Sequence, residues 1–236
     1  MNKIWAITKR ELKSYFVSPI AYIVIVVFLL FSAFIFNFII VIRYPLAEIR
    51  GIIYNMAFIF LFISPMITMR LLSEEKKIGT IELLYTSPIT LTNIVVGKYL
   101  SSVLLFFIMF LLILQYPIFI LISGTPDIGP MLSALFGFIL ISATCLAVGT
   151  FASSLTENQL VAAVLGLGFL LLFWLIGILG DNIGGSVGNF VSSLSLIKHF
   201  DDFVRGVIDL GNIFYYLAMI FFFLFITVRR LEWKRW

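Results

Sequence analysis

The chain has 236 residues, of which 62% are hydrophobic and only 12% are charged. A soluble domain carries about 25% charged residues, and apolar surface on the present scale cannot all be buried in a core of this size. The composition therefore excludes a soluble globular domain and predicts one membrane domain over residues 1–236. The net charge of +4 comes from basic residues at the ends of apolar runs, which indicates membrane orientation rather than nucleic-acid binding. The single cysteine, Cys145, excludes an internal disulfide and a cysteine-based zinc site.

The first predicted element is an amphipathic helix over residues 1–18, lying in the membrane surface with its cations near the headgroups. Its apolar face would consist of Ile4, Trp5, Thr8, Leu12, Tyr15 and Phe16, and its basic face of Lys3, Lys9, Arg10 and Lys13. The alternative is a solvated basic tail, but aromatic residues in the apolar stripe favour the interfacial helix. Pro19 then redirects the chain into the first span.

Apolar runs of about 20 residues can each cross the hydrocarbon layer as a helix. Six such runs predict an all-α integral membrane protein with six transmembrane helices. They are Ile20–Ile42, Gly51–Leu72, Tyr99–Ser123, Met131–Ser154, Gln159–Gly180 and Leu210–Val228. Pro65 in the second run and Pro117 in the third are predicted kink points.

The distribution of Lys and Arg predicts the orientation. With the N-terminus in the cytoplasm, twelve of the sixteen basic residues fall on the cytoplasmic side. Only Arg43, Arg50, Lys198 and Arg205 fall outside. We therefore expect a multi-pass protein of the cell membrane with both termini in the cytoplasm.

The predicted spans carry neither a coupling-ion site nor catalytic groups. None of the twelve acidic residues lies deep in a span, whereas ion-driven carriers usually hold the coupling ion with a buried carboxylate. No glycine-rich nucleotide loop occurs, and the single histidine, His199, lies in the segment assigned to the outside. We therefore expect no catalytic residue and no cofactor on this chain, so energy for transport would come from another subunit.

The cytoplasmic segment 73–98 contains a short apolar helix that needs something to dock against. Thr80 can cap this helix, and Glu82 in its first turn complements the positive helix end. Ile81, Leu83 and Leu84 give it an apolar surface, and a helix of this kind in water favours a partner protein. The alternative is that it folds back onto the membrane surface.

The stretch from Met69 to Pro88, MRLLSEEKKIGTIELLYTSP, resembles a motif of the ABC-2 family of permeases, and Gly97-Lys98-Tyr99 continues the match. The segment Thr8-Lys9-Arg10-Glu11-Leu12 looks like the elbow helix of that family. The resemblance implies a coupling helix in which Gly79, Thr80, Ile81, Glu82, Leu83 and Leu84 contact an ATPase subunit that binds ATP and Mg²⁺. It also implies a cytoplasmic gate formed by Glu74 and Glu75, salt-bridged to Arg10 or Lys13.

A second stretch, Leu194 to Leu210, looks like the external re-entrant hairpin of the same family, placed here within residues 181–209. The amino-acid sequence of this stretch is similar to gliding-motility-type and copper-enzyme-maturation-type members of the family. The resemblance assigns His199, Phe200, Arg205 and Asp209 to the hairpin. His199 with Asp201 and Asp202 is too small a set for a closed metal site, so no metal is expected. Residues Gly184–Gly188 are expected to form a flexible turn.

Together these features predict the permease subunit of an ATP-binding cassette transporter, with export as the family tendency. Two ATPase subunits would drive it, a second identical or related permease would complete the path, and an accessory membrane or extracytoplasmic protein could join. In such a path, span two would tilt against span five. The alternative is a membrane scaffold or assembly factor that recruits a cytoplasmic partner without translocating a substrate. An intramembrane enzyme comes third, since the catalytic groups are missing.

Overall fold

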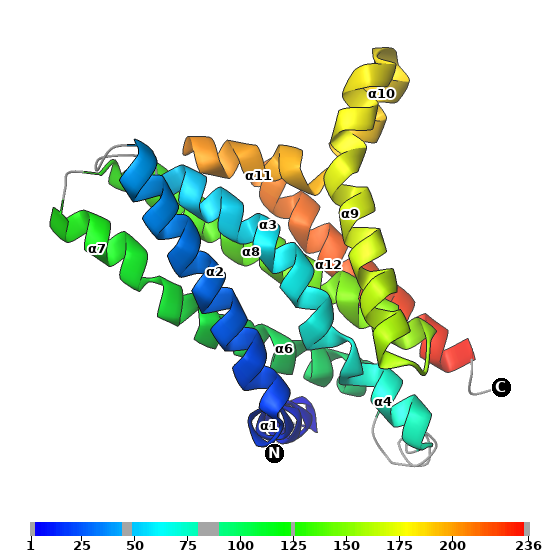
Figure 1. Cartoon of the computed structure of the whole chain (residues 1–236). Helices are drawn as coiled ribbons and strands as arrows, with labels where there is room; N and C mark the ends of the chain where they lie inside the picture. The colour runs from blue at the N-terminus through cyan, green and yellow to red at the C-terminus, as the bar shows by residue number, and fades with distance from the viewer. Residues whose placement is uncertain (1–2, 44–48, 80–89, 124–125, 234–236) are drawn as a thin grey trace.

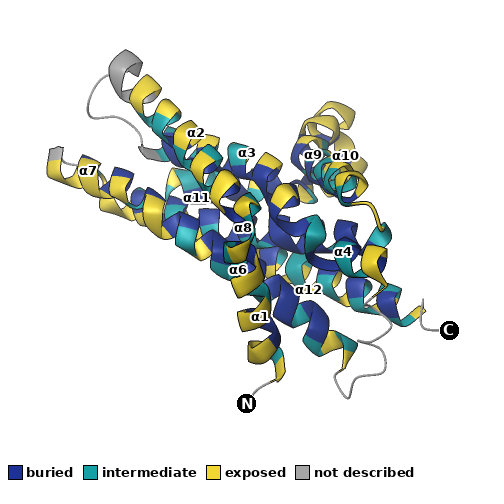
Figure 2. Cartoon of the chain, turned by 60° about the horizontal axis from the view of Figure 1, so that its bottom comes forward, coloured by how far each residue is buried: buried dark blue, intermediate teal, exposed yellow. Residues whose placement is uncertain are grey.

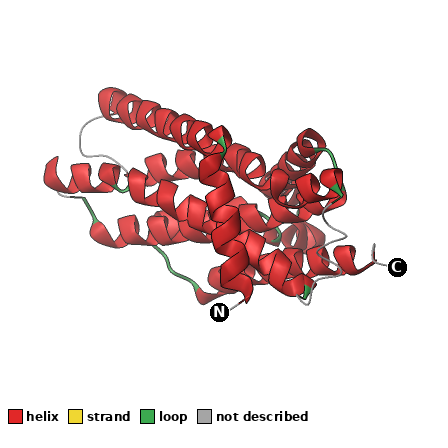
Figure 3. Cartoon of the chain, turned by 90° about the horizontal axis from the view of Figure 1, so that it is seen from below, coloured by secondary structure: helices red, strands yellow, loops and turns green. Residues whose placement is uncertain are grey.

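A computed structural model describes residues 3–43, 49–79, 90–123 and 126–233. Every regular element in these ranges is a helix, as Figure 3 shows, which confirms the predicted all-α class. In chain order the helices are α1 (Lys3–Val17), α2 (Pro19–Arg43), α3 (Ile49–Thr68), α4 (Arg70–Ile78), α6 (Leu91–Ile113), α7 (Gln115–Ser123), α8 (Ile128–Leu155), α9 (Gln159–Ile183), α10 (Gly185–Ser193), α11 (Leu196–Arg205) and α12 (Leu210–Trp233).

Within the described residues, six helical segments are long and apolar enough to cross a membrane, as the sequence predicts. They are Pro19–Phe38, Arg50–Ile78, Leu91–Ile122, Ile128–Leu155, Gln159–Ile183 and Leu210–Trp233. Helices α1 and α4 lie at one end of this bundle and α10 and α11 at the other (Figure 1). We call these the α4 end and the α11 end.

Helix α8 forms the centre of the bundle. In its most apolar stretch 78% of the residues are buried, against 22% in α2 and in α12, and Figure 2 accordingly colours much of α2 as exposed. Small residues let neighbouring helices approach α8 closely, because their backbones can come near without a bulky side chain between them. Gly149 faces Thr68 of α3 in this way, and Gly137 faces Phe203 of α11. The apolar outer faces of α2 and α12 are left for lipid.

The helices extend further than the apolar runs predict. The second span continues through α4 to Ile78, six residues beyond the predicted Leu72, and the third begins at Leu91 rather than Tyr99. Both ends of the predicted loop 73–98 are therefore helical. Polar residues such as Lys76 and Lys98 can lie in these extensions because they have partners there, as described below.

Helices also break near both predicted kink points. Pro65 lies inside α3, and the helix breaks four residues later at Met69, before α4 begins. The third span breaks at Leu114 between α6 and α7. That break is next to Ile113, the residue whose carbonyl would pair with position 117 if Pro117 had an N–H.

The segment expected as a flexible turn at Gly184–Gly188 is mostly helix. Only Gly184 and Gly185 have positive φ, 65° each, and α10 begins at Gly185. The chain can reverse here because both residues are glycines, and glycine adopts a positive φ far more readily than a residue with a side chain. Helix α10 then packs back along α9, where Gly188 lies against Gly180. Most of α10 is exposed, as Figure 2 shows.

Helix α11 runs along the α11 end of the bundle and buries Leu196, Phe200 and Phe203. It ends at Gly206, whose φ of 92° allows the chain to turn toward α12. Together α10 and α11 occupy the region in which the sequence predicts an external hairpin.

Candidate functional site

The N-terminal helix α1 is held against α6 by a close backbone contact. A Cβ placed on Gly97 of α6 would meet the Ile7 Cβ atom at 2.9 Å, so only glycine allows this approach. The Thr8 hydroxyl donates a hydrogen bond to the Gly97 carbonyl oxygen at 3.0 Å. The apolar stripe of α1 therefore faces protein, with Thr8 and Tyr15 buried. Trp5 is the exception, with 56% of its surface exposed.

A second contact joins α1 to the break between α3 and α4. The Tyr15 hydroxyl donates to the Ile67 carbonyl oxygen at 2.8 Å, just before the break at Met69. The Arg70 guanidinium lies over the Tyr15 ring at 4.4 Å, a cation–π contact. Through Tyr15, α1 therefore fixes the point at which the second span changes direction.

Helix α8 caps the first turn of α4 from outside. The first N–H groups of a helix have no partner within it. The Ser153 hydroxyl oxygen accepts from the backbone N–H groups of Leu72 and Ser73 at 3.0 and 3.2 Å, and the hydroxyl donates to the Met69 carbonyl at 2.9 Å. The Ser153 side chain thus provides hydrogen-bond partners for backbone groups on both sides of the helix break.

The last turn of α4 is tied to the end of α8. The Lys76 ammonium is buried and donates to the carbonyl oxygen of Ser154, one residue before α8 ends. A cation is favourable there because the last carbonyls of a helix carry partial negative charge. Helix α4 then ends at Gly79, which has a φ of 77°. The helix is thus anchored at both ends before the chain leaves it.

Four charged side chains from three helices meet at the α4 end, and we call them the charged cluster: Arg10 and Glu11 of α1, Glu75 of α4 and Lys98 of α6. The Lys98 ammonium lies 3.2 Å from the Glu11 carboxylate and 2.9 Å from that of Glu75. The Arg10 guanidinium lies 2.8 Å from Glu11 and 3.5 Å from Glu75. The two positive and two negative charges balance.

Burial differs sharply within the charged cluster. Only 2% of the Lys98 side chain is exposed, against 16% for Glu11 and 59% for Arg10. Burial alone would raise the pKa of Glu11, but the charges of Lys98 and Arg10 outweigh it, so that the pKa is lowered. The hydrogen bond to Glu11 in turn raises the pKa of Arg10. Both shifts favour the charged forms of Glu11 and Arg10, and Lys98 is the most buried of the residues that pair with Glu11.

The structure brings together only part of the predicted gate. Glu75 and Arg10 meet as proposed. Glu74 and Lys13 make no ion pair within the described residues. The residue that sequence reasoning missed is Lys98, which was assigned to a loop. The signal that could have identified Lys98 is a sequence compatible with a helix before Tyr99, together with Gly97, a small residue at which another helix can approach.

Most of the predicted coupling residues lie outside the described part of the chain. These are Thr80, Ile81, Glu82, Leu83 and Leu84. Gly79 is the last described residue before them, and the chain resumes at Thr90, whose hydroxyl oxygen accepts from the Asn93 N–H at 3.3 Å and caps α6. The segment between Gly79 and Thr90 therefore connects the anchored helix α4 to the capped helix α6.

The predicted hairpin residues occupy α11 and the turn after it. Phe200 is fully buried, and Arg205 is the last residue of α11. The Asp209 carboxylate accepts from the Gly211 N–H at 2.9 Å as α12 starts. The His199 ring stacks on Tyr215 at a centroid distance of 3.9 Å. Among the residues that the structure describes, no three His, Cys, Asp or Glu side chains could hold a metal ion.

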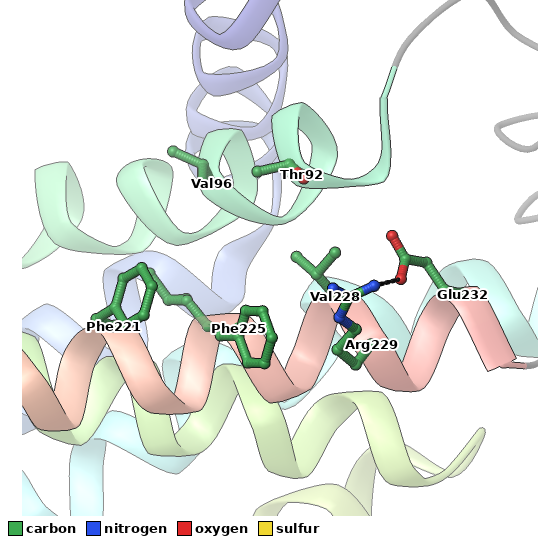
Figure 4. Close-up of a pocket in the computed structure, with 8 residues that line it drawn as sticks. Thr92, Val96, Phe221, Phe225, Val228, Arg229 and Glu232 are labelled. Carbon is green, nitrogen blue, oxygen red and sulfur yellow. Dashed lines mark hydrogen bonds and ion pairs between the residues drawn. The ribbon is translucent and has the colours of Figure 1, made fainter.

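A shallow groove of about 260 Å³ lies between the start of α6 and the end of α12 (Figure 4). Thr92 and Val96 line one side of it, and Phe221, Phe225 and Val228 line the other. The Arg229–Glu232 ion pair, 2.8 Å long, stands at its polar end. The lining is mainly apolar, with the Arg229–Glu232 pair as its charged part.

The amino-acid sequence matches a known protein family. A search of curated proteins found no match to the chain. The sequence model of the family described as ABC-2 type transporter matches residues 2–208, which covers α1, the charged cluster, the first five spans and α11. A match over this much of the chain identifies a multi-pass permease domain. The chain therefore belongs to the ABC-2 type transporter family.

Proposed function

We propose that this chain is the membrane-spanning permease subunit of an ATP-driven exporter, powered by separate ATPase subunits that dock on residues 79–84. The observation that supports this most directly is the anchoring of α4. Its first turn is capped by Ser153, its last turn is tied to the Ser154 carbonyl, and its side is held by the charged cluster. A force applied to the chain after Gly79 would therefore be transmitted to several spans at once.

The chain supplies movement rather than chemistry in this proposal. ATP and Mg²⁺ would be bound by the partner ATPase, and no catalytic step is assigned to the permease. Force would pass from the docked segment into α4, then through the charged cluster to α1 and α6, and through Ser153 to α8. Glu75 and Arg10 would act as the cytoplasmic gate, with Lys98 added to it. Both termini would lie in the cytoplasm, and the membrane would be the cell membrane.

Two permease chains with two ATPases would form the complex, because members of this family generally work as dimers with cytoplasmic ATPases. The outer surface where α3 meets α9 suits a route between the two copies. Phe58 and Phe62 of α3 are partly exposed there, and the Phe58 ring lies 5.7 Å from that of Trp174 on α9. A route bordered by aromatic and neutral side chains suits amphiphilic cargo. The likeness to gliding-motility-type and copper-enzyme-maturation-type members stays a prediction.

Reconstitution with a cognate ATPase tests the proposal. The permease alone should hydrolyse no ATP, whereas the pair should hydrolyse ATP faster than the ATPase alone. Glu82→Lys combined with Leu83→Lys should abolish this stimulation, because two cations would replace the acidic and apolar contacts of the docking surface. The matched control is Ser14→Lys with Val17→Lys, which adds cations at exposed positions of α1 at the same end.

Full stimulation by the Glu82→Lys, Leu83→Lys variant would contradict docking on this segment. Binding of the ATPase without any ATP-dependent flux, measured with fluorescent phospholipid in proteoliposomes, would favour the scaffold alternative. Direction is tested in inside-out vesicles, in which an exporter accumulates cargo upon addition of ATP.

A further inference from the structure

The single histidine of the chain lies in a hydrogen-bond network at the α11 end that only its charged form satisfies. The His199 ring of α11 forms hydrogen bonds with two groups, one on α10 and one on α12. Its Nε2 lies 2.9 Å from the carbonyl oxygen of Ser193, the last residue of α10. Its Nδ1 lies 2.6 Å from the side-chain oxygen of Asn212, which is buried in the first turn of α12.

The orientation of Asn212 is fixed by Asp202. The Asn212 side-chain nitrogen donates to the Asp202 carboxylate at 2.8 Å. An ionised carboxylate only accepts hydrogen bonds, so the amide nitrogen of Asn212 must face Asp202 and the amide oxygen must face His199. Flipping the amide would place two acceptors against each other at Asp202.

Both partners of the His199 ring are therefore acceptors. A backbone carbonyl and an amide oxygen can only accept, so Nε2 and Nδ1 must both donate. Neutral imidazole carries one N–H and one lone pair, whereas imidazolium carries two N–H groups. A positive charge is also favoured beside Ser193, because the last carbonyls of a helix have no partner within it and carry partial negative charge.

We propose that His199 is a proton-dependent latch that, when charged, ties the end of α10 to the start of α12. When the ring loses this proton, one ring nitrogen carries a lone pair instead of an N–H group, and that lone pair faces an acceptor oxygen. The α10–α11 pair then loosens from the bundle. Histidine suits this task because it is the side chain whose charge ordinarily changes between pH 5 and 8.

The surrounding contacts show what the latch holds in place. The chain turns between α10 and α11 at Leu194 and Ser195, and Tyr215 of α12 donates through its hydroxyl to the Leu194 carbonyl at 2.7 Å. Tyr216 donates to the Leu196 carbonyl at 2.8 Å. These two bonds involve neutral groups and do not depend on pH in this range. The remaining members of the set that joins α10 and α11 to α12 are His199 and Asp202, and histidine is the one whose charge ordinarily changes between pH 5 and 8.

Any test must distinguish the pH response of His199 from that of other titratable groups near the network. Burial raises the pKa of Asp201, with Arg205 opposing this effect and Asp202 adding to it. Lys198 donates to the Ser192 hydroxyl at 2.8 Å and lies 3.8 Å from Asp181 at the end of α9. The titratable or charged groups facing the network are Asp181 on α9, Lys198, Asp201, Asp202 and Arg205 on α11, Tyr215 and Tyr216 on α12, and Cys145 on α8.

Hydrogen exchange of the reconstituted full-length chain tests the latch. After correction for the intrinsic pH dependence of exchange, amides of residues 185–205 should lose protection by about tenfold between pH 6 and pH 8, the factor expected for losing one hydrogen bond of a charged group. His199→Gln should show no such change. Asp201→Asn is the matched control and should keep the wild-type response, because Asp201 is not in the network.

A spectroscopic measurement on the wild-type chain covers the case in which His199→Gln does not fold. Because the chain has one histidine, ¹⁵N NMR of labelled histidine reports this ring alone. Both ring nitrogens should be protonated wherever residues 185–205 are protected, with the two transitions sharing a midpoint. A neutral ring at pH 6 in a fully protected segment would overturn the latch. Equal protection at pH 6 and pH 8, or a response retained in His199→Gln, would overturn it as well.

If α10 and α11 close the route in the proposed function, cargo flux should also rise or fall through the same midpoint. This consequence rests on the proposed function, whereas hydrogen exchange and ¹⁵N NMR do not. A latch with the expected exchange behaviour but without an ATP-dependent flux would therefore disprove the transporter assignment alone.

Discussion

At the scale of single residues, Lys98 has the most consequence at the α4 end. Its ammonium is 2% exposed and is the only member of the charged cluster that contacts both carboxylates at 3.2 Å or less. A buried ion pair contributes little compared with apolar packing, but removing one partner leaves the other charge buried without compensation. The cluster is therefore expected to be sensitive to single changes and tolerant of their combination.

Lys98→Met should reduce the free energy of unfolding by about 3 kcal/mol, since Glu11 and Glu75 would lose their buried cation and share only the more exposed Arg10. Chemical unfolding in detergent measures this loss. Adding Glu11→Gln and Glu75→Gln to Lys98→Met should restore most of it. Lys13→Met, an exposed position on α1, is the control and should change stability by less than about 0.5 kcal/mol. A stable single variant would show that the cluster does not hold α1 to α6.

Gly97→Val should displace α1, because the added atoms would overlap Ile7 at the point where the two helices touch. We expect a loss of about 2 kcal/mol from this overpacking, together with a change in Trp5 fluorescence as α1 moves. Gly168→Val on α9 is the matched control, since no atom lies within 4 Å of a Cβ placed there. Equal effects of the two substitutions would argue against a specific contact.

At the scale of the helices, α4 depends on a cap that its own sequence lacks. Ser153→Ala removes the acceptor for two N–H groups and the donor to Met69, and should cost about 2 kcal/mol. Ser154→Ala is the neighbouring control, because the Ser154 hydroxyl bonds within its own helix and its carbonyl still accepts from Lys76. Thermal unfolding compares the two. Similar melting temperatures for both variants would show that α4 does not need the cap.

Some features of these helices could be predicted from the sequence, and others could not. The six spans follow from apolar runs, because a bilayer demands them whatever the tertiary contacts are. The extension of α3 into α4 does not follow, since it depends on Ser153 from a helix 80 residues away in the chain. Glu75 and Arg10 could be paired by resemblance to a family motif. Lys98 lies in the predicted loop instead, because hydropathy alone starts the third span only after this charged residue.

At the scale of the whole molecule, orientation in the membrane can be tested with the native cysteine removed. In a Cys145→Ala background, Lys77→Cys at the α4 end and Asn189→Cys on α10 are both exposed. A membrane-impermeant maleimide added outside intact cells should label Asn189→Cys and not Lys77→Cys. Permeabilised cells should label both. The reverse pattern would place the α4 end outside and contradict docking of a cytoplasmic ATPase there.

The central position of α8 limits where cargo can travel. With α3, α9, α11 and α12 packed around it, most of this helix is buried, and its exposed apolar residues are Ile128, Leu132 and Phe136, close to its start. In a transport cycle, helices that move against one another, such as α3 and α9, would therefore share α8 as their common neighbour. Along the buried part of α8 no room is left for cargo, so we expect a route to run over outer surfaces of the subunit that a second copy would cover.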